Sequence, residues 1–182
     1  MNKIAVVWTV CTCLVAVSLA YAQKGLGEPR EMSGSYNPQL WHGDDARFVV
    51  DTVEMSRSEV ELSKLAIAKS NGKDVQNLAL VLVRDEGKIN HTLTSWSRTY
   101  GFALPKKEDE KLAAEQDRLK ELNGADFDQA YFELMAKDNA ADVSRFQAEA
   151  GDAIDHDLAK FALKYGPKLQ ADGQLLPKQK YK

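Results

Sequence analysis

Cysteine is almost absent from this chain, and the position of its two cysteines excludes most sulfur chemistry. The two cysteines, Cys11 and Cys13, both lie inside an apolar run at the N-terminus. A lipoprotein signal would instead place its cysteine at the end of such a run, after a small residue, so lipidation is not expected. Once the run is removed, the chain can form neither a disulfide nor a thiolate metal site.

The sequence also lacks the common catalytic signatures. It has no Gly-x-Ser-x-Gly elbow, no phosphate-binding glycine loop and none of the Glu-x-x-His motifs of di-iron bundles. The three histidines are scattered, and none falls on the apolar stripe of an expected helix (His42, His91 and His156). These absences favour a protein that is not an enzyme.

Excess charge of either sign is small. The chain has 24 Lys and Arg residues against 27 Asp and Glu, and removing Lys3 leaves 23 against 27, a net charge of −4. Mild acidity argues against nucleic acid and anionic membrane surfaces as partners. A short basic tail over residues 177–182, with Lys178, Lys180 and Lys182, is interpreted as a solvated terminus.

The first 22 residues are typical of a cleavable signal peptide. Lys3 is followed by an apolar run from Ile4 to Leu19 and then by Ala20-Tyr21-Ala22, which offers small residues at the positions that signal peptidase reads. The alternative is an uncleaved membrane anchor. Cleavage predicts a periplasmic protein with no integral membrane segment after processing. A flexible leader rich in Gly, Pro, Ser and Asn follows over residues 23–42.

The rest of the chain predicts an all-α fold. No stretch shows the alternation and β-branched enrichment of a strand, whereas apolar residues recur every three or four positions. Capping and turn residues predict helices at about 45–70, 73–100, 108–122, 126–150 and 155–172, the last with a bend at Pro167. Short connections favour an up-down four-helix bundle with an extra short helix, over residues 43–176.

Each long helix places one polar side chain in its apolar stripe, namely Glu59, Glu86, Asn139 and Asp172. The fourth and fifth stripes are read as Phe132, Met135, Asn139, Val143 and Phe146, and as Ile154, Leu158, Phe161, Tyr165, Leu169 and Asp172. If the four polar groups converge, they form a metal site whose oxygen ligands suit a divalent cation such as Ca, Mg or Mn. Alternatively they never meet, or they pair with Arg84, Arg145 or a lysine.

Several segments carry a resemblance to a known family. They are Glu59 to Ala66, Val83-Arg84-Asp85, Gly101-Phe102-Ala103-Leu104-Pro105 and Leu122 to Asp128. With these, the chain resembles the bacterial ferritin-like exported proteins grouped as domain of unknown function 4142. The resemblance implies a ferritin-like helical bundle and an exported location, but no established activity.

The chain departs from that family at three positions. Typical members carry Asp-His on the second and fourth helices and a histidine near the end of the last. This chain keeps Asp85 and Asp138 but has Glu86 and Asn139 at the two histidine positions, and Asp172 at the third. The resemblance therefore implies loss of a soft or borderline metal site, leaving a hard-cation site or a structural polar core.

Two functions remain. The first is an exported, non-enzymatic protein of the bacterial cell envelope with a binding or stress-protective role. Its ligand would be a cation, a small molecule, an envelope protein or a second copy of the chain in a homo-oligomer. The alternative is a metal-binding or redox-active ferritin-like protein with a carboxylate-rich interior site.

Overall fold

The computed structural model describes residue 41, residues 43–106 and residues 110–177, and these residues form helices only. The elements are α2 (Gly43–Lys69), α3 (Lys73–Tyr100), α4 (Glu110–Glu121), α5 (Gly124–Asp152), α6 (His156–Asp172) and the 3-10 turn η2 (Gly173–Leu175). No strand occurs in these ranges. The prediction of an all-helical fold is therefore confirmed, and every expected helix begins and ends within three residues of its predicted bounds.

Some of the predicted segments lie outside the residues that the structure describes. The signal peptide expected at 1–22 lies outside the described residues, as do the leader apart from Trp41 and the tail after Pro177. The division of the chain into these segments stays a prediction. All the described residues belong to one compact unit that spans 37–182.

Local chemistry explains where the helices end. Gly101 has a φ of +70°, a left-handed conformation that suits glycine, and the following Phe102 N–H donates to the Ser97 carbonyl at 2.8 Å. At the start of α6, the Asp155 carboxylate accepts from the backbone N–H groups of Asp157 and Leu158 at 2.8 and 3.1 Å. These caps give α3 and α6 defined ends.

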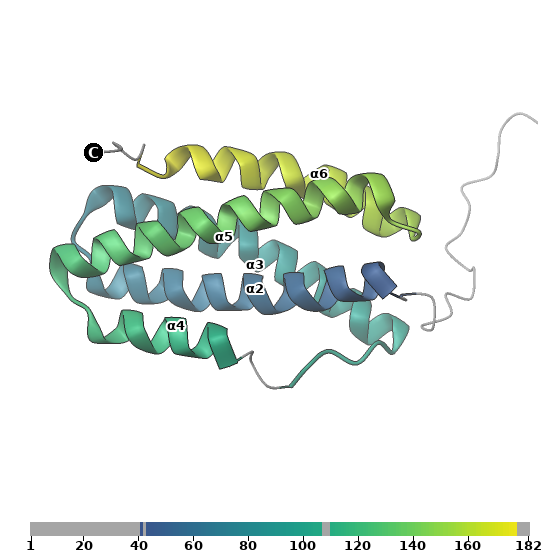
Figure 1. The fold of residues 1–182 in the computed structure, drawn as a ribbon, viewed down its shortest axis with the longest axis horizontal. Helices are drawn as coiled ribbons and strands as arrows, with labels where there is room; N and C mark the ends of the chain where they lie inside the picture. Colours follow the sequence, from purple (N-terminus) through teal and green to yellow (C-terminus); the bar gives the residue numbers. More distant parts are fainter. Residues whose placement is uncertain (1–40, 42, 107–109, 178–182) are drawn as a thin grey trace, which may run out of the picture. The chain divides into compact units, whose positions relative to one another are not determined.

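The helices pack as two neighbouring pairs. Helix α2 packs along α3, and α5 packs along α6, while α2 also contacts α5 and α3 also contacts α6. The long helices run in alternating directions through the bundle, and α4 lies against α2 and α5 (Figure 1). Helix α4 buries only Leu119, so it covers the α2–α5 side without contributing much to the core.

The interior has apolar regions towards both ends. In one, Phe48, Phe146 and Phe161 lie with ring centroids 5.1 to 6.4 Å apart. The other is an aliphatic and aromatic cluster made of Leu62, Ala66, Val75, Leu78, Ala79, Leu82, Leu119, Phe127, Tyr131 and Met135. Between these two regions, α2, α3 and α5 bury polar side chains, among them the carboxylates of Glu59, Glu86, Asp138 and Asp142. The middle of the bundle is therefore a polar layer between two apolar ones.

Helix α6 begins and ends close to the predicted residues, but its buried stripe begins later than expected. Ile154, expected on the buried stripe, precedes α6 and is 82% exposed. Pro167 lies inside α6 at an exposed position, and the helix continues through it to Asp172. Proline has no N–H to donate to the carbonyl four residues earlier, but on this exposed side water can donate to that carbonyl instead. None of the helices in the described part of the chain is both long and apolar enough to cross a membrane.

Candidate metal centre

Three carboxylates from three helices meet in the middle of the bundle. Glu59 on α2, Glu86 on α3 and Asp142 on α5 each offer one oxygen, and these oxygens lie within 4.8 Å of one another. The three residues are 3%, 2% and 3% exposed. Each helix brings its carboxylate inward because the position belongs to the helical stripe that faces the core.

The cluster leaves hydrogen-bonding capacity unused. Glu59 Oε1 and Glu86 Oε1 are buried and have no hydrogen-bond partner. Buried polar atoms are normally paired, because leaving one unpaired costs roughly 1–3 kcal/mol. A bound proton or a bound cation would satisfy such atoms in a cluster of carboxyls.

Arg145 supplies the cationic partner of the cluster. It lies one helical turn after Asp142, and its Nη1 donates to Asp142 Oδ1 in a close ion pair. The side chain of Asp142 is 5% exposed and that of Arg145 is 24% exposed. The guanidinium therefore joins the buried carboxylates to the surface. When all three carboxyls are ionised, the cluster and Arg145 together carry a formal charge of −2.

Burial and mutual repulsion act on the protons of the cluster. Burial first, and then the charges of Glu86 and Asp142, raise the pKa of Glu59 well above its usual range. Burial also raises the pKa of Glu86, with Asp142 and Asp172 adding to it and Arg145 opposing it. For Asp142, burial raises the pKa against the opposing effect of Arg145. These carboxyls therefore hold protons more readily than exposed ones do, unless another cation takes their place.

Further carboxyls surround the cluster. Asp138, one turn before Asp142, is 5% exposed, and burial raises its pKa to about 6. Burial and the charge of Asp85 raise the pKa of Asp172 to about 6. Asp85 itself is bound by the guanidinium of Arg84, which holds its pKa below the usual range. The polar layer thus extends from α5 to the middle of α3 and the C-terminal end of α6.

Two of the four residues singled out in the sequence meet in this cluster. Glu59 and Glu86 do, whereas Asn139 is half-buried and its Nδ2 donates to the Leu169 carbonyl of α6 at 2.7 Å. Asp172 is 6% exposed, and its Oδ2 has no hydrogen-bond partner. It acts on the pKa of Glu86 but is not one of the three clustered residues.

Asp142 was missed because the stripe of α5 was read in the wrong register. The inward residues of this helix are Phe127, Tyr131, Met135, Asp138, Asp142, Phe146 and Glu149. Their spacing of four, four and three residues then repeats, whereas the predicted stripe stepped from Met135 to Asn139 and Val143. Beginning the count at Phe127 would have placed Asp138 and Asp142 inside.

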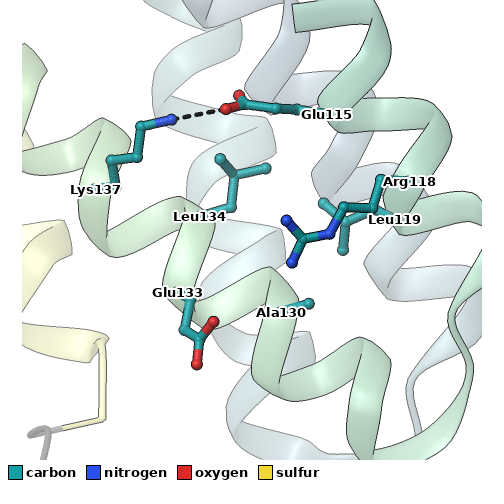
Figure 2. Close-up of a pocket in the computed structure, with 7 residues that line it drawn as sticks. All are labelled: Glu115, Arg118, Leu119, Ala130, Glu133, Leu134 and Lys137. Atoms are coloured by element: carbon teal, nitrogen blue, oxygen red, sulfur yellow. Dashed lines mark hydrogen bonds and ion pairs between the residues drawn. The ribbon is translucent and has the colours of Figure 1, made fainter.

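A shallow pocket between α4 and α5 is a weaker candidate. Its volume is about 180 Å³, and Lys137 of α5 reaches across it to Glu115 of α4 at 2.7 Å, beside Leu134 (Figure 2). The pocket is lined by Glu115, Arg118, Leu119, Ala130, Glu133, Leu134 and Lys137. The ion pair ties α4 onto the bundle, so this pocket is accounted for as a helix contact.

The fold and the cluster together define an all-helical bundle protein with a buried layer of carboxylates. The model of the family described as domain of unknown function DUF4142 matches residues 31–175. The chain therefore belongs to the DUF4142 family, as its sequence motifs indicated.

A solved structure shares this fold. It is a protein from Streptomyces coelicolor described as "putative secreted protein DUF305", with a TM-score of 0.61 and 16% sequence identity. The match covers 73% of this chain and 88% of that one. At this identity the likeness shows a common helical fold only. The comparison with curated proteins finds no match to this chain.

Proposed function

We propose that this chain is an exported, non-enzymatic binding protein whose bundle holds a hard divalent cation on Glu59, Glu86 and Asp142. One observation carries the proposal: three buried carboxylates present oxygens within 4.8 Å of one another, and two of the residues have a buried oxygen without a partner. Three carboxylates in one interior cannot all ionise unless a cation offsets their repulsion.

The chemistry of the cluster selects among ligands. All its donor atoms are carboxylate oxygens, which suit Ca²⁺, Mg²⁺ or Mn²⁺ better than copper or zinc. The formal charge of −2, with Arg145 included, matches one divalent ion. A small organic ligand fits less well, because the cluster is closed in by apolar layers towards both ends of the bundle.

Export and the finer description of the fold belong to the same proposal. The apolar run before Ala20-Tyr21-Ala22 supports secretion to the periplasm, and the Streptomyces coelicolor protein with the same fold is described as a "putative secreted protein". The alternating directions of α2, α3, α5 and α6 support an up-down, ferritin-like bundle (Figure 1).

Thermal melting with added ions tests the cation site. The purified protein is treated with chelator and melted with Ca²⁺, Mg²⁺, Mn²⁺, Zn²⁺ or Cu²⁺. A bound ion stabilises the fold by RT ln(1 + [L]/Kd), or about 2.7 kcal/mol at a hundredfold excess over Kd. For a domain of this size, that corresponds to a rise in Tm on the order of 5 °C. We expect one of the three hard cations to give the largest rise.

Two glutamate variants make the test specific. Glu86→Gln removes one ligand charge and is expected to abolish the rise. Glu61→Gln is the matched control, because Glu61 is exposed on α2 and pairs with the exposed Lys64. It should leave the rise unchanged. If no ion raises the Tm of the wild-type protein, the cation site does not exist and the cluster is a structural polar core.

A further inference from the structure

Arg145 lies at the boundary between the buried cluster and the surface of the α2–α5 side. Two surface pockets open there, with volumes of about 290 and 480 Å³, and Asp51 and Arg145 line both. The first also includes Asp138 and the second Glu149. Arg145 therefore stands between the two openings, with its guanidinium on Asp142.

The walls of these pockets are rich in carboxylates. Asp51 and Glu54 of α2 face Asp138, Glu149 and other acidic residues of α5, and Lys111, Lys137, Arg47 and Arg145 supply the positive charge. Lys137 is engaged by Glu115 of α4. Arg145, by contrast, pairs with a member of the cluster itself, so its charge acts directly where a cation would bind.

We infer that Arg145 is the specificity-determining residue of the interior site, which it restricts to divalent cations by adding one positive charge to three carboxylates. The inference rests on the cation site proposed above and adds the residue that sets its preferred ion charge. Without Arg145 the cluster would carry a formal charge of −3 and would suit a trivalent ion.

Electrostatics gives the direction and size of the effect. Removing a positive charge near a bound ion lowers the energy of that ion in proportion to the charge of the ion. A trivalent cation therefore gains more than a divalent one. At separations of several ångströms inside a protein, the extra unit of charge corresponds to a change in relative affinity of at least about tenfold.

Competition between Mn²⁺ and Tb³⁺ measures this selectivity. Free Mn²⁺ is followed by electron paramagnetic resonance and bound Tb³⁺ by luminescence, on the wild-type protein and on Arg145→Gln and Arg145→Met. In both variants we expect the ratio of the Mn²⁺ Kd to the Tb³⁺ Kd to rise at least about tenfold. Arg145→Lys keeps the charge and should retain the wild-type ratio.

Lys137→Gln is the matched control. It removes one positive charge from the same helix and the same pocket, but its ion-pair partners are Glu115 and Asp138, neither of which is one of the three clustered carboxylates. We expect its Kd ratio to stay within about twofold of wild type. Circular dichroism checks that each variant folds, which the 24% exposure of the Arg145 side chain favours.

Each possible result is decisive. If the Arg145 variants bind Mn²⁺ with the wild-type Kd ratio, the specificity role is wrong while the cation site stands. If wild type binds neither ion, the cation site is wrong and the inference falls with it. Unfolding of both Arg145→Gln and Arg145→Met would also contradict the inference, since it would make Arg145 a structural residue.

Discussion

At Glu86 the apolar face of α3 is interrupted by a carboxyl that is 2% exposed, with one oxygen lacking a hydrogen-bond partner. Keeping such a group in a core costs stability unless a ligand uses it. In the presence of chelator we expect Glu86→Leu to raise the free energy of unfolding by about 1–3 kcal/mol. Urea unfolding followed by circular dichroism measures the change.

The same variant should lose the response to cations. Adding the ion that stabilises wild type should leave the urea midpoint of Glu86→Leu unchanged, because one ligand is gone. Glu86→Gln separates the two effects, since it also removes the ligand charge but keeps a polar group in the core. A Glu86→Leu protein that is less stable than wild type in chelator would mean that the carboxyl contributes to the apo fold.

Glu149 gives the stability of the protein a separate dependence on pH. Burial, followed by the charges of Asp45 and Asp155, raises the pKa of Glu149 to about 7. An unfolded chain titrates this carboxyl near pH 4.5, so between about pH 4.5 and 7 the folded state holds the proton more tightly. Stability therefore falls as the pH rises through this window, and the loss is complete above about pH 7.

We expect Glu149→Gln to remove this part of the pH dependence. Although Glu149 is 6% exposed, it lines an open pocket, so solvent screening reduces the effect to about 1–2 kcal/mol. Relative to wild type, the variant should gain that much at pH 8 and nothing at pH 4. Denaturant unfolding at a series of pH values tests this, with the exposed Glu121→Gln as control. A difference between Glu149→Gln and wild type that does not vary with pH would contradict it.

At the scale of the helices, the sequence predicts where each helix begins and ends better than it predicts which face of the helix is buried. Asn123-Gly124 and the Asp155 cap mark helix ends directly, because their chemistry is local. Which face of α5 points inward depends on packing against α2 and α6. The predicted stripe was shifted by one residue, so it included Asn139 in place of Asp138 and left out Asp142.

Asn139 has a packing role that its place near the interior does not reveal. It bonds α5 to the Leu169 carbonyl, and a Cβ added at Gly173 would lie 2.4 Å from Asn139 Oδ1. Gly173→Ala must therefore displace the Asn139 amide and disturb its bond to α6. We expect the variant to lose about 1–2 kcal/mol of stability in denaturant unfolding.

Gly87→Ala is the matched control for that change. Gly87 lies within α3, and an added Cβ there would meet nothing within 4 Å. Alanine should therefore stabilise the helix by about 0.5–1 kcal/mol. In the double variant Asn139→Ala, Gly173→Ala, the cost of Gly173→Ala should shrink, since the clash is gone. Equal costs of Gly173→Ala with and without Asn139 would refute this account of the contact.

For the whole molecule, convergence of the site could not be read from one sequence. Glu59 and Glu86 each follow from a local stripe, but their meeting depends on the heights at which α2 and α3 pair across the short turn at 70–72. That α5 adds Asp142 rather than Asn139, and that Asp172 lies beside the cluster, depends on how the two helix pairs dock. The all-helical fold could be predicted from local patterns alone. Predicting the site would also require knowing how three pairs of distant segments align with one another.

Export is the prediction that concerns the chain as a whole. The segment before Ala20-Tyr21-Ala22 carries Lys3, an apolar run and small residues at the two positions that signal peptidase reads. We expect the protein in an osmotic-shock fraction to begin at Gln23, to contain no cysteine and to melt at the same Tm with or without reductant. Intact mass spectrometry identifies the first residue.

Ala22→Leu places a bulky residue at the cleavage position and should leave the full-length chain in the membrane fraction, whereas Gln23→Asn should be processed normally. Full-length wild-type chain in washed membranes would show instead that the apolar run remains as an anchor.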